Sequence, residues 1–330
     1  MKKEEMREIS GNAQSDGAAL KALLPAQDIL CFHFADGAGR DAVCVFADAL
    51  TDKDLLAEQV LRPFKAYAGG TQAEEVAAHL LSPEVRVQTS FQKLAEEVLA
   101  GNPVLLWDGG DAGIAAGTKK VPLRAVAEPP TDVAIKGPRE GFVEDVKTNT
   151  ALVRRRLKTG ELRIEMLAVG RRTATAVALC WLEGTCRADI VERVKKKLAA
   201  VDIDGVPDSS YLVRFLADRP RSLIKQVGTT EKPDIFCAKL CEGRAGILTD
   251  GSPIALTLPY LLVEDFQSGE DYFVPAYRAT FTRLLRLFAL LVAIYLPAFY
   301  VAAQIFKLQL LPIRLLLTIA GSVRDIPLSP

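Results

Sequence analysis

Histidine and cysteine are scarce in this 330-residue chain, which has two histidines and six cysteines and no Cys-x-x-Cys pair. So few ligating side chains leave little material for a metal site or a disulfide framework, and the cysteines are most simply buried thiols in a reducing compartment. Net charge is absent as well, because 41 basic side chains balance 41 acidic ones. A neutral chain lacks the basic surface that neutralises nucleic-acid phosphates. The composition therefore excludes general nucleic-acid binding, and 49% hydrophobic residues exclude a mainly disordered chain.

The amino terminus lacks the apolar stretch of a signal peptide. Residues 1–6 (MKKEEM) are charged and of mixed sign, and no apolar core follows within the first two dozen residues. Because residues 1–25 are rich in small and polar side chains, we expect them to form a flexible N-terminal tail. We expect the region that follows to stay on the cytoplasmic side of a membrane.

Catalytic motifs are also missing. The sequence contains no Gly-x-Ser-x-Gly elbow, although a triad assembled from distant residues cannot be read from spacing. Residues 108–113 (DGGDAG) lack the Gly-Lys-Ser/Thr ending of a phosphate-binding loop, so we expect a hairpin turn there. Asp202 and Asp204 lack the further oxygen ligands that calcium requires. We therefore expect no enzymatic site, no cofactor and no metal.

One long apolar run is present, from Leu287 to Phe306, without a single side chain that is charged at neutral pH. As a helix it would span about 30 Å, the thickness of the hydrocarbon core of a bilayer. We expect residues 276–330 to form a membrane segment, with a transmembrane helix at about 284–306 and then a short apolar re-entrant or partial second segment. The alternative is a buried hairpin in a soluble domain. The residues expected in the transmembrane helix include Leu287, Leu291, Tyr295, Pro297, Phe299 and Phe306.

An internal repeat is the most informative pattern. An apolar strand, a turn and an amphipathic helix occur in residues 43–64 and again in residues 177–198. A helix, a glycine, an apolar strand and an Asp-Gly turn follow in residues 91–109 and again in residues 235–251. Two matches in the same order indicate that the soluble part of the chain contains one structural unit twice.

The repeat predicts an α/β fold, because short apolar strands that alternate with helices form sheets covered by helices. We expect two related α/β subdomains, residues 26–127 and residues 161–275, in a cytoplasmic region followed by the C-terminal transmembrane helical segment. Asp54 and Asp189 are expected as the caps of the first helix after the strand in each copy.

Residues 128–160 are expected to form a connector and a linking helix. The prolines and glycines of the connector predict ordered turns. Its end presents adjacent charges of opposite sign in a fixed geometry, suited to ion pairing between domains or subunits, or only to local stabilisation of the turn. For the three arginines of the helix, contact with phosphate or lipid headgroups, a solvated helix face and a salt bridge to another subunit are all open. The candidate assembly or inter-domain motif consists of Gly137, Pro138, Arg139, Glu140, Gly141, Arg154, Arg155 and Arg156.

The same connector and helix carry a resemblance to a known family. Residues 128–142 (EPPTDVAIKGPREGF) and 148–156 (TNTALVRRR) resemble the A subunit of GerA-type spore germinant receptors. Lys232 stands where the family usually has arginine and Asp132 where it usually has glutamate. The chain also ends before the later membrane helices of the family, so it looks truncated. Further matching stretches are residues 169–172 (VGRR), 203–205 (IDG), 230–234 (TEKPD), 248–253 (LTDGSP) and 266–272 (FQSGEDY).

The resemblance implies a subunit of a spore germinant receptor in the inner membrane of the spore. Such a subunit would take part in nutrient-triggered germination as an oligomeric ion channel or a signal-transducing component. Its implied partners are a transporter-like B subunit, a lipoprotein C subunit, further copies of itself and membrane lipid.

Two other functional classes stay open from the residues alone. One is a membrane-tethered adaptor that binds a protein partner and has no pore of its own. The other is a soluble α/β enzyme with a hydrophobic terminal hairpin. The uninterrupted apolar run argues against the enzyme.

Overall fold

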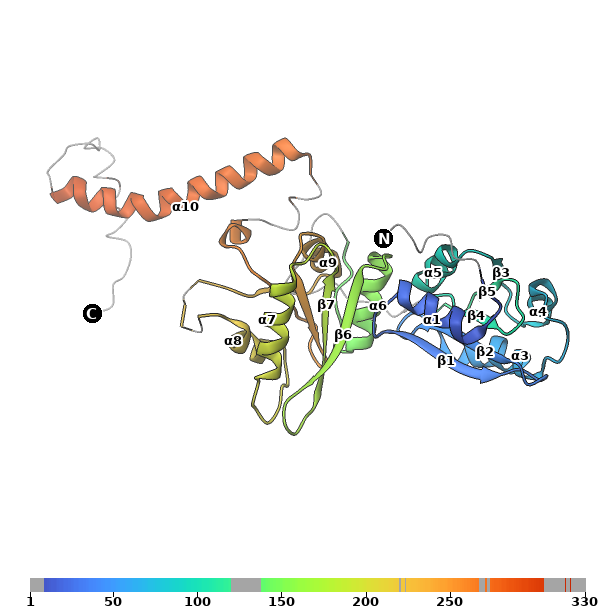
Figure 1. The fold of residues 1–330 in the computed structure, drawn as a ribbon. Coiled ribbons are helices and arrows are strands. Elements are labelled where there is room, and N and C mark those ends of the chain that lie inside the picture. The colour runs from blue at the N-terminus through green and yellow to red at the C-terminus, as the bar shows by residue number, and fades with distance from the viewer. Residues whose placement is uncertain are drawn as a thin grey trace. The chain divides into compact units, whose positions relative to one another are not determined.

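The computed structural model describes residues 9–119, 138–219, 221–222, 224–266, 271, 274–305, 318 and 321. The chain divides into two compact units, Met1–Leu262 and Val263–Pro330. The first unit contains two α/β modules, each built on a five-stranded sheet (Figure 1). We call residues 9–119 the N-module and the described residues of 138–262 the C-module.

The N-module sheet has the strand order β1-β2-β4-β5-β3, and every neighbouring pair is antiparallel. The connection from β4 to β5 is a hairpin, as expected for residues 108–113. Its strands are β1 (Ile29–Ala35), β2 (Asp41–Ala47), β3 (Val85–Gln88), β4 (Val104–Trp107) and β5 (Gly113–Ala116). Its helices are α1 (Ala13–Leu23), α2 (Lys53–Leu56), the π-helical η1 (Ala57–Leu61), α3 (Arg62–Ala66), α4 (Ala73–His79) and α5 (Phe91–Leu99).

Helices cover both faces of the N-module sheet. Successive side chains of a strand point to opposite faces, so a strand buried on both sides is apolar throughout. In β2, Val43 packs in the core formed with α1 and α5, whereas its neighbour Cys44 packs in the core formed with α2 to α4. The apolar runs read from the sequence are therefore central strands of a three-layered module.

The C-module repeats this architecture with the order β6-β7-β9-β10-β8, again antiparallel throughout. Helices α6 and α9 form a core on one face of the sheet, and α7 and α8 on the other. The strands are β6 (Leu162–Val169), β7 (Thr175–Leu182), β8 (Gly228–Thr230), β9 (Ala245–Thr249) and β10 (Ala255–Leu258). The helices are α6 (Val146–Arg156), α7 (Ala188–Ala199), α8 (Ser210–Leu216) and α9 (Pro233–Cys241).

The shared strand order confirms the prediction of two related α/β subdomains. Each strand of the N-module has its counterpart at the same place in the C-module order, and α1 and α6 both precede the first strand of their sheet. Between the second and third strands, the N-module has α2, η1, α3 and α4 where the C-module has α7 and α8. The helix expected to link the subdomains is thus part of the second one, where Leu152 of α6 packs beneath the sheet.

Two local expectations were wrong. Residues 13–23, expected in a flexible tail, form α1, because Leu20 is fully buried against the sheet. Asp54 and Asp189 do not cap their helices: Asp52 caps α2 by accepting from the backbone N–H groups of Asp54 and Leu55. Asp189 lies inside α7, where its carboxylate pairs with arginine side chains instead.

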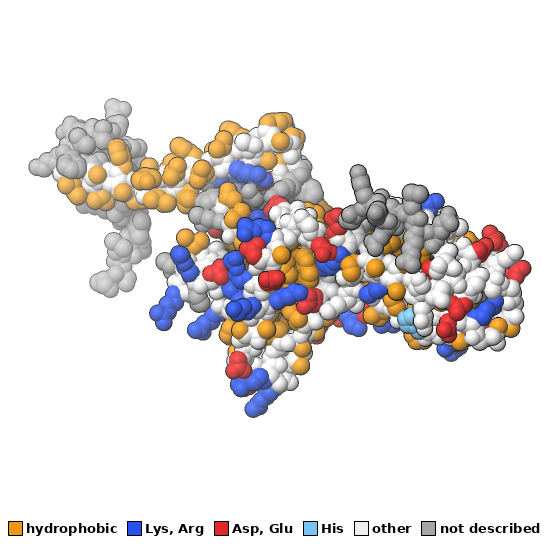
Figure 2. Space-filling view, in the orientation of Figure 1, with side chains coloured by type: hydrophobic (Ala, Val, Ile, Leu, Met, Phe, Trp, Pro, Cys, Tyr) orange, Lys and Arg blue, Asp and Glu red, His pale blue; other side chains and the backbone are white. Residues whose placement is uncertain are grey.

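The second unit contains the 3-10 helix η2 (Leu262–Phe266), which begins at the boundary, and α10 (Ala276–Ile305). Residues Ala276–Ala302 of α10 are long and apolar enough to cross a membrane, and the apolar 18-residue window within them has a mean hydropathy of 2.1 and no buried residue. Hydrophobic side chains cover the helix along the face seen in Figure 2. Near its start, the buried carboxylate of Asp271 pairs with Arg283 at 3.2 Å and with Arg286 at 2.8 Å.

Candidate functional site

Each module holds the N-terminus of its first helix with an Asp-Gly turn. In the N-module, the Asp108 carboxylate accepts a hydrogen bond from the backbone N–H of Ala13 at 2.8 Å. In the C-module, the Asp250 carboxylate accepts one from the backbone N–H of Val146 at 3.1 Å. Carboxylates stabilise helix N-termini because the first N–H groups of a helix have no partner within it. Residues 108–113, the stretch most similar to a phosphate-binding loop, thus have a structural role.

An ion pair joins the two modules at a buried position. Arg154 of α6 is 1% exposed and is the largest fully buried side chain among the described residues. Its guanidinium donates to both carboxylate oxygens of Asp28, at 2.8 and 3.0 Å, in the bidentate geometry that makes such pairs strong. It also donates to the backbone carbonyls of Thr159 and Leu162. Arg154 therefore fixes the start of β1 to the helix of the other module.

Main-chain contacts continue this junction along the edge of the second sheet. The backbone N–H of Gln27 donates to the carbonyl of Ile164 in β6 at 3.3 Å. The side-chain oxygen of Gln27 accepts from the backbone N–H of Met166 at 2.8 Å. The segment before β1 thus covers part of the free edge of β6, which lowers the tendency of an edge strand to pair with another chain.

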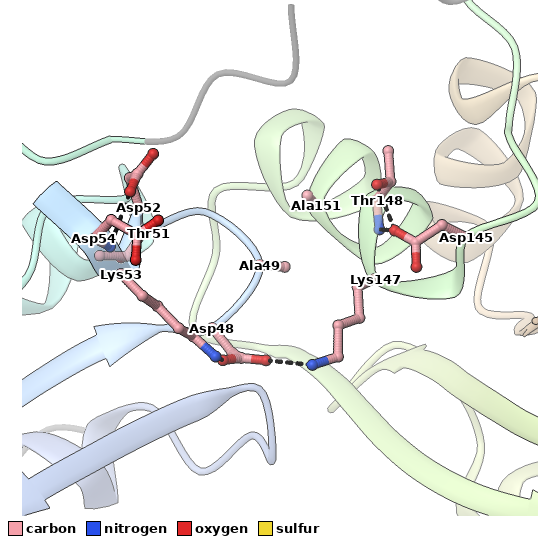
Figure 3. Close-up of a pocket in the computed structure, with 10 residues that line it drawn as sticks. All are labelled: Asp48, Ala49, Thr51, Asp52, Lys53, Asp54, Asp145, Lys147, Thr148 and Ala151. Carbon is pink, nitrogen blue, oxygen red and sulfur yellow. Dashed lines mark hydrogen bonds and ion pairs between the residues drawn. The ribbon is translucent and has the colours of Figure 1, made fainter. Parts of the chain in front are cut away.

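A cleft of about 420 Å³ opens beside this junction (Figure 3). At its base, Lys147 of α6 reaches across from the C-module to the Asp48 carboxylate at 3.4 Å, and Lys53 binds the same carboxylate. Burial raises the pKa of Asp48, but its hydrogen bonds and charge interactions with Lys53 and Lys147 outweigh burial and lower it. The complete lining is Asp48, Ala49, Thr51, Asp52, Lys53, Asp54, Asp145, Lys147, Thr148 and Ala151.

The predicted motif residues divide into two groups in the structure. Glu140 receives hydrogen bonds from Arg155 and, at 2.7 Å, from Arg156, so these charges pair within the C-module. Burial raises the pKa of Glu140, but these two arginines lower it below its ordinary value. Arg154 instead crosses to the N-module. Pro138, Arg139 and Gly141 lie in the segment that leads into α6, and Gly137 lies outside the described residues.

The expected transmembrane residues lie on one helix. Leu287, Leu291, Tyr295, Pro297 and Phe299 are all exposed residues of α10, whereas Phe306 lies outside the described residues. Within the part of the chain that the structure describes, no group of three or more His, Cys, Asp or Glu side chains is placed to hold a metal ion.

Sequence reasoning missed the acidic side of the junction. Asp28 stands in no motif, Asp48 stands only in a turn of the repeat, and each is far in sequence from its partner in α6. One usable signal was the repeat: Asp28 and Asp48 directly flank the paired strands β1 and β2, where Glu161 and Glu183 flank β6 and β7.

Comparisons with known proteins agree with this architecture. The family described as Bacillus/Clostridium GerA spore germination protein matches residues 19–330. The chain is 34% identical over 328 residues to spore germination protein B1 of Bacillus subtilis (strain 168), a match covering 98% of this chain and 68% of that protein. It is 35% identical over 243 residues to spore germination protein KA of the same organism, covering 74% of this chain and 45% of that protein. The matches thus span between 45% and 68% of the length of these two relatives.

A solved structure shows the same fold. It is the N-terminal domain of the A subunit of the Bacillus megaterium spore germinant receptor GerK3, with a TM-score of 0.60 and 23% identity. The likeness covers 78% of this chain and 98% of that domain. The resemblance noted in the connector is therefore confirmed across nearly the whole sequence, and the chain belongs to the GerA family of spore germination proteins.

Proposed function

We propose that this chain is an A-type subunit of a spore germinant receptor and takes part in nutrient-triggered germination as an oligomeric membrane channel or signal-transducing component. The observation that carries the proposal is the combination, in one GerA-family chain, of a tightly joined pair of α/β modules with an exposed apolar helix of membrane-spanning length. The modules face the cytoplasm, and the helix lies in the inner membrane of the spore. The partners are a transporter-like B subunit, a lipoprotein C subunit and further copies of the chain.

The junction supports a transducing role rather than a catalytic one. Arg154 and Asp28 form a bidentate buried pair, so the two modules are coupled through a contact that tolerates little rearrangement. Two modules joined in this way can move together as one rigid body, so a displacement of one module is transmitted to the other. A receptor subunit that transduces a signal requires this. The Asp-Gly turns, meanwhile, already hold the N-termini of α1 and α6, which leaves less reason to assign them to a substrate.

Genetics in the spore-former that encodes the chain tests this function. The gene is deleted in a strain without its other GerA-family receptors, and nutrient-triggered germination is followed as the fall in optical density of a spore suspension. We expect deletion spores to stay dormant and a wild-type copy to restore germination. Restoration by a copy with Leu291→Arg, which disrupts α10, would contradict a role in the membrane. Unchanged germination of the deletion spores would overturn the proposal.

The alternative is an adaptor that is tethered to the membrane and has no pore. Among the described residues one helix qualifies as a membrane span, and a pore needs several helices, from other copies or from other segments. Ion flux separates the two: vesicles that contain the receptor with its full-length subunits should release a trapped cation when the nutrient is added. Binding of the subunit to its receptor partners without any nutrient-dependent flux would favour the adaptor.

A further inference from the structure

The acidic side of the module junction has a counterpart in the C-module, and no other module binds that counterpart among the residues that the structure describes. The backbone N–H of Asp48 donates to the carbonyl of Asp28 at 2.8 Å, and that of Glu183 donates to the carbonyl of Glu161 at 2.9 Å. Both pairs flank the first two strands of their sheet, so Glu161 occupies the position of Asp28 and Glu183 that of Asp48. Glu161 is exposed, and the side chain of Glu183 is 61% exposed.

The helical side of the junction is repeated as well. In the C-module, Arg154 donates to the carbonyls of Thr159 and Leu162. In the N-module, Lys21 of α1 donates to the carbonyls of Ala26, at 2.6 Å, and Ile29. Counting from the caps Asn12 and Asp145, Lys21 and Arg154 are the same position of the two helices. Lys21 thus provides a cation where the junction uses Arg154.

The two helices differ in what covers this face. Ala151 of α6 is buried in a core shared with the N-module, whereas its counterpart Ala18 of α1 is exposed. Gln14, the counterpart of Lys147, is exposed too. Within the described residues no second module covers this face of α1, so the N-module presents the surface that α6 uses in the junction.

The edge of the first sheet lies beside this surface. Strand β1 is the edge strand equivalent to β6; its Ile29 and Cys31 pack in the core with α1, whereas the exposed Leu30 and Phe32 lie on the opposite face, which carries α2 to α4. The equivalent edge of the C-module, that of β6, is partly covered by Gln27 of the N-module. An edge strand presents unpaired backbone N–H and C=O groups, to which another chain readily binds.

We propose that a second copy of this chain docks head to tail on the first, its Glu161 and Glu183 facing Lys21 and Gln14 of α1 as Asp28 and Asp48 face Arg154 and Lys147 within the chain. The interface is heterologous, since two different surfaces meet, and it therefore generates a ring or an open array of copies. Repetition of a contact that already exists between related modules, together with charge complementarity, selects a second copy as the occupant.

This interface is weaker than the intrachain junction. Gln14 is neutral where Lys147 is charged, and Arg163 already pairs with Glu183. Copies held in one membrane meet at high local concentration, which compensates for low affinity. The inference rests on the proposed function, because it names the surface through which the oligomeric subunit assembles.

Cross-linking of the full-length chain in membranes tests the interface. Two differently tagged chains carry Gln14→Cys and Glu183→Cys, each in a background with Cys31→Ser and Cys241→Ser to remove the cysteines that are not buried. A short bis-maleimide should give a product with both tags when the chains are expressed together. Either variant alone should give none. Glu192→Cys, on an exposed position of α7, replaces Glu183→Cys as the matched control and should not cross-link.

An intrachain pair shows that the reagent reaches the required distance. Asp48→Cys with Lys147→Cys replaces two side chains whose charged atoms lie 3.4 Å apart, so this pair should react within one chain. If it reacts and the mixed membranes give no doubly tagged product, the head-to-tail interface is refuted. Cross-linking of Gln14→Cys with itself would refute it as well, because it would show a two-fold contact. A germination assay on the same strains distinguishes failure of the interface from failure of the proposed function. Spores that germinate but give no doubly tagged product would refute the head-to-tail interface and leave the receptor function intact.

Discussion

Arg154 and Asp28 lie 126 residues apart in the sequence, yet the guanidinium of one binds both carboxylate oxygens of the other, at 2.8 and 3.0 Å. Their side chains are 1% and 10% exposed, so the pair is shielded from water. Removing two charges from water is costly, and the attraction between them repays this cost only when the geometry is good and further hydrogen bonds are made. The carbonyls of Thr159 and Leu162 provide those bonds.

Substitution of one member of this pair should destabilise the chain strongly. Arg154→Met removes the guanidinium that donates to the Asp28 carboxylate and to two carbonyls, and breaking a buried pair in this way costs about 3–5 kcal/mol. Urea unfolding of the detergent-solubilised chain measures the loss. Arg155→Met, at the half-exposed neighbouring position, is the matched control and should cost far less. The double variant Arg154→Met/Asp28→Leu should recover part of the loss, and equal losses for Arg154→Met and Arg155→Met would contradict the assignment.

Glu140 should make stability depend on pH in the acidic range. Burial raises its pKa, but Arg155 and Arg156 lower it below the usual 4.5. A lowered pKa means that the folded state binds the proton less readily than the unfolded state, so the stabilisation is complete above 4.5 and is lost as the pH falls through the folded value. Glu140→Gln should therefore lower the unfolding temperature at about pH 7, with a difference that shrinks below 4.5. Glu192→Gln on exposed α7 is the control, and a difference independent of pH would contradict the ion-pair explanation.

In the Asp-Gly turns, removing the side-chain oxygen that accepts the hydrogen bond should destabilise the chain more than removing only the negative charge. Asp250→Ala removes the acceptor of the Val146 N–H at the start of α6, at a cost of about 1 kcal/mol. Asp250→Asn keeps a side-chain oxygen and should cost less. Because Asp108 does the same for α1, Asp108→Ala and Asp108→Asn should show the same order. Urea unfolding measures all four, and equal losses for alanine and asparagine would show that charge, not the hydrogen bond, matters.

The sequence predicted the repeat because the strands are apolar on both faces. Strands such as β2 and β7 form short apolar runs in the sequence, and an Asp-Gly turn follows β4 and again β9, at the same place in each repeat. Helix α1 was not predicted because its apolar periodicity is weak: small residues surround Leu20, whose burial depends on the sheet beneath it. Local composition therefore identified the elements with strong periodicity and missed the one that tertiary packing stabilises.

The same reason explains the incomplete prediction of the junction. Three consecutive arginines look alike in sequence, but Arg154 is buried while Arg155 and Arg156 are partly exposed. Their different roles depend on Asp28 and Glu140, one of which is distant along the chain. Residue type indicated a charged contact, and only the fold assigned its partner.

A charge in the middle of α10 should prevent stable membrane insertion. Leu291 lies within the apolar span Ala276–Ala302, where an arginine costs about 3 kcal/mol for insertion at the centre of a membrane helix. Leu291→Arg should therefore move a measurable share of the full-length chain out of the membrane fraction after an alkaline wash. Tyr277→Arg, in the first turn of the same helix, adds the same charge where it can reach the interface and should leave the chain in the membrane. If both variants stay in the membrane fraction equally, α10 does not anchor the chain through its apolar centre.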